Sequence, residues 1–177
     1  MTLTADRHAQ ALAGLRIAVG VLFLIFAEYK VFGTQFTLGG GFQYWINRFL
    51  TDGAYPFMAP VLRGFVLPYG TAIAFLVAYG ELAIGLALTL GVGVRAASVS
   101  GLVYMLLLLF ASNYPGPAAV LWQYFGAALS HLGLAFCFAA LAYAPADETF
   151  SLGPYLRRVI KARRDGNGFG GGGDHEG

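Results

Sequence analysis

Charged residues are scarce in this chain of 177 residues, of which 11% are charged and 58% are hydrophobic. This composition excludes an ordinary soluble globular domain and predicts a membrane protein. The formal net charge of +2 is too small for a nucleic-acid-binding protein, and the basic residues do not alternate with aromatic ones. We therefore expect the chain to contact the lipid bilayer and no nucleic acid.

Cysteine is nearly absent, because Cys137 is the only one in the chain. A single cysteine excludes a disulfide framework, a CxxC redox pair and a cysteine-based metal site. It also argues against a four-helix membrane enzyme of the vitamin-K-epoxide-reductase type, whose chemistry needs paired thiols. We predict no metal site.

Long apolar runs are abundant, and four of them could cross a bilayer as helices: about 11–32, 69–90, 95–112 and 120–143. The first run contains a stretch as short as a signal-peptide core, but no small-x-small cleavage site follows it, so we favour a membrane helix. The predicted fold is an all-α bundle of four transmembrane helices, in one membrane domain at 11–145. A short segment (1–10) precedes it, and a basic, glycine-rich tail (146–177) follows, which we expect to be disordered beyond Arg164.

The long connection between the first two spans contains apolar residues at helical spacing, from Phe42 to Phe49, with Gln43, Asn47 and Arg48 on the other side. This pattern predicts a short helix at the membrane interface. A loop whose aromatic residues lie at headgroup level is the alternative. Prolines punctuate the rest of the connection, where a second short helix is expected at about 57–67.

Lysine and arginine are unevenly distributed between the two ends of the spans. Both termini and the turn at 91–95 hold eight of them, and the opposite end holds the other three, Lys30, Arg48 and Arg63. Because cytoplasmic segments are enriched in these residues, both termini are predicted to be cytoplasmic, in the inner membrane of a bacterium.

Three polar residues fall near the middle of their spans: Glu81, Tyr104 and His131. Because a helix rises 1.5 Å per residue, similar distances from the span ends place them at a similar depth. Stripes of small residues on the same faces indicate that these faces pack against other helices. A carboxylate in the bilayer costs roughly 2.5–3.5 kcal/mol on insertion scales, so Glu81 needs compensation, for which Arg16 is the cation predicted to be nearest.

Each of these residues also has a structural interpretation. Glu81 could be an ion-paired or protonated packing residue, His131 a hydrogen-bonded core residue and Tyr104 a packing residue. Glu28 and Lys30 lie at the outer edge, where long side chains reach water at little cost. Arg95 and the basic tail residues are interpreted as topology and anionic-lipid signals.

Two residue clusters are similar to those of a known family: Arg16-x3-Gly20 with Ala27-x2-Lys30, and Glu81-x3-Gly85-x5-Gly91-x3-Arg95. They resemble the DoxX/DoxD family of four-helix membrane proteins, which includes the small membrane subunit of thiosulfate:quinone oxidoreductase. The resemblance covers about 12–155. It departs from the family pattern at Ala27, where glycine is common, and at the additional acid Glu28. The aromatic connection at 45–68 is more similar to the DoxD-like members.

The resemblance implies a membrane subunit of a redox system that passes electrons to a quinone, as in the oxidation of a sulfur compound such as thiosulfate. In that case Glu81 and His131 would carry protons, and Arg16 and Tyr104 would belong to the quinone pocket. An anion on the outer side would meet Lys30, Arg48 and Arg63. A second subunit would supply the electrons, and a homo-oligomer is also compatible with the resemblance.

Two other functions remain open from the sequence. The chain could be a non-catalytic scaffold or assembly protein that docks a soluble partner. A solute or proton pathway is less favoured, because the spans show no pairs of broken helices.

Overall fold

The computed structural model describes residues 2–126, 128–144 and 149–167. Within these ranges the structure is helical, as predicted, and its elements are α1 (Thr2–Phe32), α2 (Thr34–Thr37), α3 (Gly41–Asp52), α4 (Ala59–Val61), the π-helical turn η1 (Leu62–Val66), α5 (Gly70–Leu90), α6 (Val94–Ala111), α7 (Leu121–Gly126), α8 (Leu129–Tyr143) and α9 (Gly153–Asn167).

Three helices in the described chain are long and apolar enough to cross a membrane, namely α1, α5 and α6. Large apolar side chains such as Leu76, Leu107 and Phe136 are exposed on the outside of the bundle, as expected for surfaces that face lipid. The chain is therefore a multi-pass membrane protein.

The predicted continuous fourth span is wrong in its first part, because the helix is interrupted after Gly126 and starts again as α8. With 15 residues, α8 rises roughly 22 Å, less than the roughly 30 Å of a hydrocarbon core. Its capping residue, Ala128, is fully buried. The fourth helix therefore begins inside the bundle.

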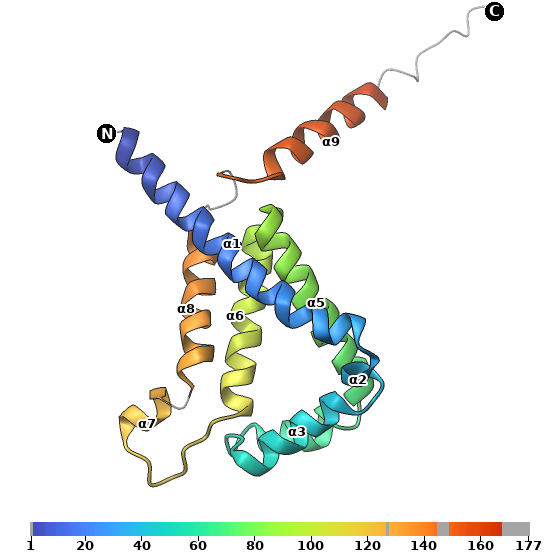
Figure 1. Ribbon diagram of the computed structural model, residues 1–177, viewed down its shortest axis with the longest axis vertical. Coiled ribbons are helices and arrows are strands. Elements are labelled where there is room, and N and C mark those ends of the chain that lie inside the picture. Colours follow the sequence, from blue (N-terminus) through green and yellow to red (C-terminus); the bar gives the residue numbers. More distant parts are fainter. Residues whose placement is uncertain (1, 127, 145–148, 168–177) are drawn as a thin grey trace, which may run out of the picture.

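The spans are arranged as two helix pairs. α1 packs along α5, and α6 packs along α8, with fewer contacts between the pairs. In Figure 1, α5 and α6 lie close together at their connecting turn and diverge toward the end that carries α3. The end at the α5–α6 turn is therefore called the closed end, and the end that carries α3, toward which the helices diverge, is called the open end.

Glycines allow the close approach within each pair. In α1, a Cβ added to Gly20 would lie 2.8 Å from the backbone nitrogen of Thr89 and 3.0 Å from the carbonyl oxygen of Gly85 in α5. In the other pair, a Cβ on Gly101 would collide with the ring of Phe138. The predicted small-residue stripes therefore lie on the packed faces: Ala27, Ala74, Ala78, Gly85, Ser98, Gly101 and Ala135 are buried.

We expect Gly20→Ala to destabilise the protein by about 1–3 kcal/mol, because the new methyl group meets backbone atoms that can yield only if α1 and α5 separate. Gly14→Ala is the matched control on the same helix, since nothing lies within 4 Å of a Cβ at Gly14. Thermal unfolding in detergent measures both. Equal melting temperatures for the two variants would contradict the packing described here.

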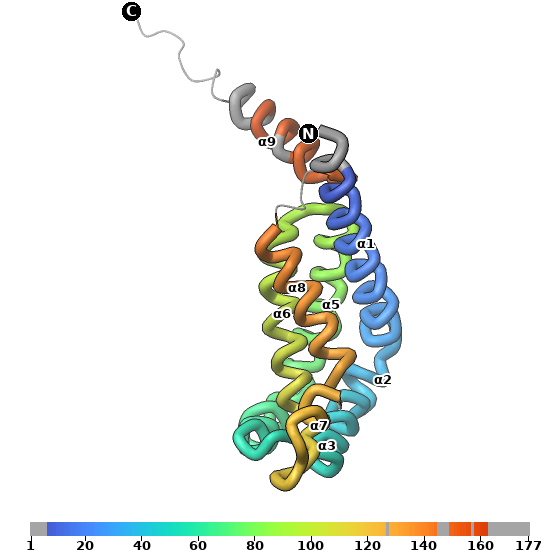
Figure 2. The backbone as a smooth tube through the Cα atoms, turned by 90° about the vertical axis from the view of Figure 1, so that its left-hand side faces the viewer, coloured from blue at the N-terminus to red at the C-terminus, as the bar shows by residue number. Residues whose placement is uncertain are grey.

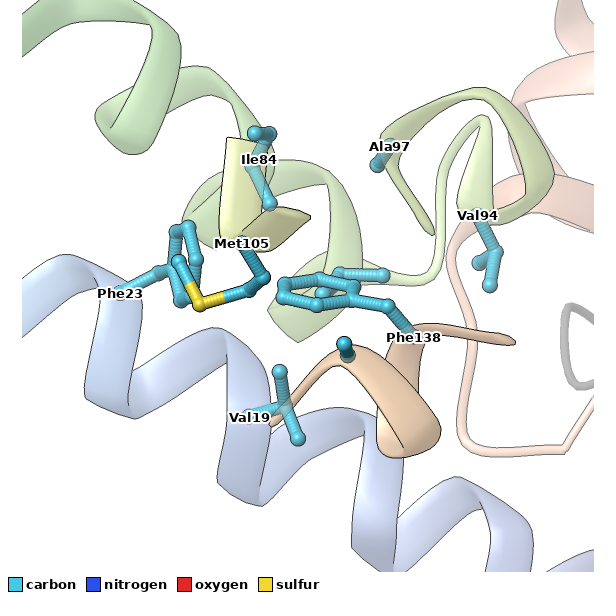
Figure 3. Packing of buried hydrophobic residues seen from close by; sticks show 9 residues of the cluster. Val19, Phe23, Ile84, Val94, Ala97, Met105 and Phe138 are labelled. Atoms are coloured by element: carbon cyan, nitrogen blue, oxygen red, sulfur yellow. The ribbon is translucent and has the colours of Figure 1, made fainter. Parts of the chain in front are cut away.

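Aromatic and thioether side chains fill the centre of the bundle, where α1, α5, α6 and α8 meet. Phe23 of α1 lies edge-to-face against Phe138 of α8, with ring centroids 5.1 Å apart, and Met105 of α6 packs into the same cluster. Figure 3 shows these side chains converging from separate helices. This cluster connects the two helix pairs.

The open end is covered by the connection between α1 and α5. Phe42 and Ile46 of α3 are buried in a cluster with residues of α2, η1 and α5, and Asn47 and Arg48 are exposed, as the helical pattern predicts. Gln43 departs from the prediction, because its half-buried side chain lies where a Cβ on Gly70 would be. This helix therefore packs on the bundle as well as bordering the interface.

The closed end holds a contact between the C-terminal link (149–153) and the α5–α6 turn. Leu152 N donates to the Leu90 carbonyl at 3.0 Å, and Ser151 Oγ donates to the Gly91 carbonyl at 2.7 Å. The link continues into α9, and in Figure 2 α9 and the start of α1 lie at the same end of the bundle. The prediction of disorder beyond Arg164 is wrong for the next three residues, because α9 continues to Asn167. The rest of the predicted disordered tail, 168–177, lies outside the described residues.

Candidate functional site

Glu81 lies at the centre of a polar cluster formed by three helices. Its carboxylate is buried and accepts hydrogen bonds from Lys30 Nζ at 2.5 and 2.6 Å and from the Tyr104 hydroxyl at 2.5 Å. Lys30 comes from α1, Glu81 from α5 and Tyr104 from α6. The cluster therefore joins the two helix pairs.

Lys30, not Arg16, is the cation that compensates Glu81. Side chains of an α-helix lean toward its N-terminus, so the long stem of Lys30 reaches back from the outer end of α1 into the bundle. Arg16 lies 14 positions earlier, roughly 21 Å along the helix. The predicted pairing with Arg16 is wrong because it treated Lys30 as a residue that reaches outward.

Arg16 is fully buried at the opposite end of the bundle. Its Nη2 atom donates to the carbonyl oxygens of Phe150 at 2.7 Å and Thr149 at 3.2 Å. A Cβ on Gly91 would collide with the same guanidinium. The structure thus places Arg16 under the C-terminal link and outside the Glu81 cluster.

The outer side of Lys30 is closed by α2. Its ammonium group lies 5.2 Å from the centroid of the Phe36 ring, within the range of a cation–π contact. The side chain of Lys30 is 17% exposed, whereas Glu28, the neighbouring acid, is fully on the surface. Lys30 is thus held between a carboxylate and an aromatic face.

A cavity of about 600 Å³ adjoins the cluster. Its polar walls are Lys30, Glu81, Tyr104, Ser130 and His131, and its other walls are apolar or aromatic, contributed mainly by α1, α3 and α6. The structure therefore brings Glu81, Tyr104 and His131 to one cavity, as their shared depth predicts. A concave, largely apolar pocket with a few convergent polar groups is the usual form of a small-molecule site.

His131 lies in the first turn of α8, immediately after the break in the fourth helix. Its Nδ1 atom is buried and makes no hydrogen bond to the part of the chain that the structure describes. A ligand in the cavity could supply a partner for this nitrogen. The interruption of the fourth helix is what positions His131 at the cavity wall.

A second cavity, of about 940 Å³, lies between α5 and α6 and is lined almost entirely by apolar residues. Glu81 and Tyr104 line this cavity as well as the first. Together with five apolar residues they form the shared wall of the two cavities: Phe42, Ile46, Phe49, Val77 and Leu108. The polar cluster can therefore be approached from two sides.

The cluster combines a carboxylate, an ammonium group and a phenol. The ion pair leaves no net charge in the cluster, and the hydroxyl of Tyr104 gives one carboxylate oxygen a further hydrogen bond, which reduces the cost of burial. Carboxylate, amine and phenol can each accept or release a proton, so the hydrogen-bonded chain has the composition of a proton-transfer site.

Arg48 and Arg63, the other two residues predicted to contact an anion on the outer side, do not form one cluster of free positive charge with Lys30. Arg48 forms an exposed ion pair with Asp52 at 2.9 Å, and the Tyr44 hydroxyl and Asp52 together raise the pKa of Arg48. Arg63 is exposed on η1. Because Lys30 and Arg48 each face a carboxylate, the three residues do not present three free charges to an anion.

Sequence reasoning missed two parts of the site. The Lys30–Glu81 pair joins residues 51 positions apart. The sequence indicated only that a buried acid needs a cation nearby, and not which cation it is. Phe36 and Trp45 line the cavity, but they lie in the connection between the first two spans, where the sequence predicts an interfacial helix from Phe42 and no part of the site. Within the described ranges, no three His, Cys, Asp or Glu side chains group as they would around a metal ion.

The DoxX family model matches residues 11–114, which is more than half of the chain and includes α1, α5 and α6. Comparisons with curated proteins and with solved structures gave no match. The matched region contains Lys30, Glu81 and Tyr104, and ends before α8 and His131. The chain belongs to the DoxX family.

Proposed function

We propose that the cavity beside Glu81 binds the headgroup of a quinone, and that the protein is the membrane subunit of a redox system. The observation that carries the proposal is the Lys30–Glu81–Tyr104 chain of hydrogen bonds at the wall of an aromatic cavity. A bound quinone accepts two electrons and two protons on reduction. Ionisable groups in hydrogen-bond contact at one cavity suit the proton part of that chemistry.

The residues around the cavity fit a flat, weakly polar headgroup. Phe26 and Trp45 supply apolar surface, and the buried Nδ1 of His131 lacks a hydrogen-bond partner in the described chain. In this proposal His131 donates a hydrogen bond to the headgroup, and the Tyr104 hydroxyl turns from Glu81 to donate to a quinone carbonyl when the quinone binds. Glu81 receives and returns protons, and Lys30 keeps the carboxylate in place and balances its charge.

In the same proposal the electrons come from a partner subunit that oxidises a small sulfur compound such as thiosulfate. The protein lies in the inner membrane with both termini in the cytoplasm, since the end that carries the termini and the α5–α6 turn is richer in Lys and Arg. The cavity then opens toward the outer half of the bilayer.

Quinone binding can be measured through Trp45, which lines the cavity. Trp122 is the only other tryptophan and is exposed, so Trp122→Phe leaves a single fluorophore at the site. We expect a short-chain benzoquinone to quench it saturably. Tyr104→Phe should weaken binding about fivefold, as expected for loss of roughly 1 kcal/mol from one hydrogen bond, and Glu81→Gln and His131→Ala should also weaken it.

Tyr79→Phe and Glu28→Gln are the matched controls, because both residues are exposed on α5 and α1 and lie away from the cavity. They should bind quinone as the single-tryptophan parent does. Quenching that does not saturate, or binding that is unchanged in folded Glu81→Gln and His131→Ala proteins, would refute the quinone site. A scaffold whose polar core only fixes helix packing would then be the better interpretation.

A further inference from the structure

The last described helix, α9, carries an apolar face that nothing in the bundle covers. Tyr155, Leu156, Val159 and Ile160 recur at helical spacing, and each is exposed, Ile160 by 65%. In Figures 1 and 2, α9 projects away from the four apolar helices. An exposed apolar stripe of this kind marks a surface that binds something.

The rest of α9 is strongly basic. Its sequence, Gly153–Asn167, contains five Lys or Arg residues and a single acid, Asp165. Arg158 and Lys161 are exposed and lie roughly 100° and 160° around the helix from Val159, outside the apolar face. A short helix with one apolar and one basic side is the pattern of a segment that lies on an anionic membrane surface.

The contact with the bundle fixes where α9 starts relative to the bilayer. Leu152 N donates to the carbonyl of Leu90, the last residue of the membrane-crossing helix α5. Ser151 Oγ donates to the carbonyl of Gly91, and Arg16 donates to the carbonyls of Thr149 and Phe150. The first residue of α9 therefore lies at the end of a span, at the level of the headgroups.

We infer that α9 binds the anionic lipid surface of the bilayer that the same chain crosses. The apolar face contacts the acyl chains, and the basic side chains meet the phosphate groups of lipids such as phosphatidylglycerol. The C-terminal link holds the helix at the surface, so binding requires only that α9 turn its apolar face toward the lipid. This surface is separate from the Glu81 cavity, which lies toward the other end of α1 and α5.

The test uses the full-length protein in nanodiscs of phosphatidylcholine alone or of equal parts phosphatidylcholine and phosphatidylglycerol. In a Cys137→Ala background, Val159→Cys carries a polarity-sensitive fluorophore on the apolar face, and Arg158→Cys carries it on the basic side. We expect the emission of the label at position 159 to shift to the blue in anionic discs and to stay water-like in neutral ones. The label at position 158 should remain water-like in both.

Charge removal and salt provide two further controls. Arg157→Gln, Arg158→Gln and Lys161→Gln together should abolish the blue shift at position 159, whereas Arg48→Gln with Arg63→Gln, at the other end of the bundle, should not. Salt at 1 M, where the Debye length falls to about 3 Å, should also reduce it. Equal shifts in neutral and anionic discs, shifts at both label positions, or no shift in anionic discs would each overturn the inference.

Discussion

Lys30→Met is expected to destabilise the protein by about 3 kcal/mol, because it leaves a buried carboxylate without its cation. Methionine has nearly the length of the lysine stem, so it removes the charge and leaves no large void. Glu81 then either remains charged at an unfavourable depth or takes up a proton. Unfolding by SDS in mixed micelles, followed by circular dichroism, measures the loss.

Replacing both partners should restore most of the stability. In Lys30→Met with Glu81→Gln no charge is left in the cluster, and the new amide oxygen can still accept the hydrogen bond of Tyr104. We expect the double variant to lie within about 1 kcal/mol of the parent, since neutral replacements of buried ion pairs are often harmless. Glu81→Gln alone should cost less than Lys30→Met, because a lone lysine can extend toward the outer surface.

The exposed pair Arg48–Asp52 provides the control for this cycle. Both side chains are more than half exposed, at 54% and 56%, and they lie one helical turn apart. Arg48→Met should therefore leave stability unchanged within error. A comparable loss in Arg48→Met and Lys30→Met, or additive effects of Lys30→Met and Glu81→Gln, would show that the buried pair is not coupled as the structure indicates.

The sequence predicts much of this fold because its strongest signals are local. Apolar length identifies α1, α5 and α6, and small residues at three- and four-residue spacing identify the packed faces of helices. Ala74, Ala78 and Gly85 were assigned to the packed face of α5 and are buried there. The shared depth of Glu81, Tyr104 and His131 follows from the same regular rise per residue.

The errors concern features that depend on tertiary contacts or on side-chain direction. The partner of Glu81 was missed because depth was counted along the backbone, whereas the stem of Lys30 covers the remaining distance. The break after Gly126 was missed because the alanines that follow it favour a helix. The sequence does not show that Ala128 is fully buried among other helices. The helix α9 was missed because its basic residues were interpreted only as topology and anionic-lipid signals, and its apolar residues were not considered.

Arg16→Met should release the C-terminal link from the bundle. The buried guanidinium donates to two carbonyl oxygens of the link, and a hydrogen bond from a charged group contributes about 1.5–3 kcal/mol. Loss of even one such bond increases the equilibrium constant for opening of the link by roughly tenfold or more. Hydrogen–deuterium exchange of a peptide containing Leu152, whose amide is bonded to Leu90, reports that opening. Arg95→Met, an exposed arginine beside the same turn, should leave the exchange unchanged.

The turn itself offers an independent route to the same contact. Gly91 and Gly93 both have left-handed backbones, with φ of 71° and 63°, so alanine at either position costs about 1–2 kcal/mol of strain. Only at Gly91 would the added Cβ also collide with Arg16 and Ser151, whereas nothing lies within 4 Å at Gly93. Gly91→Ala should therefore accelerate exchange at Leu152 as Arg16→Met does, and Gly93→Ala should not. Equal acceleration in the two alanine variants would attribute the effect to the turn and would remove Arg16 as the group that holds the link.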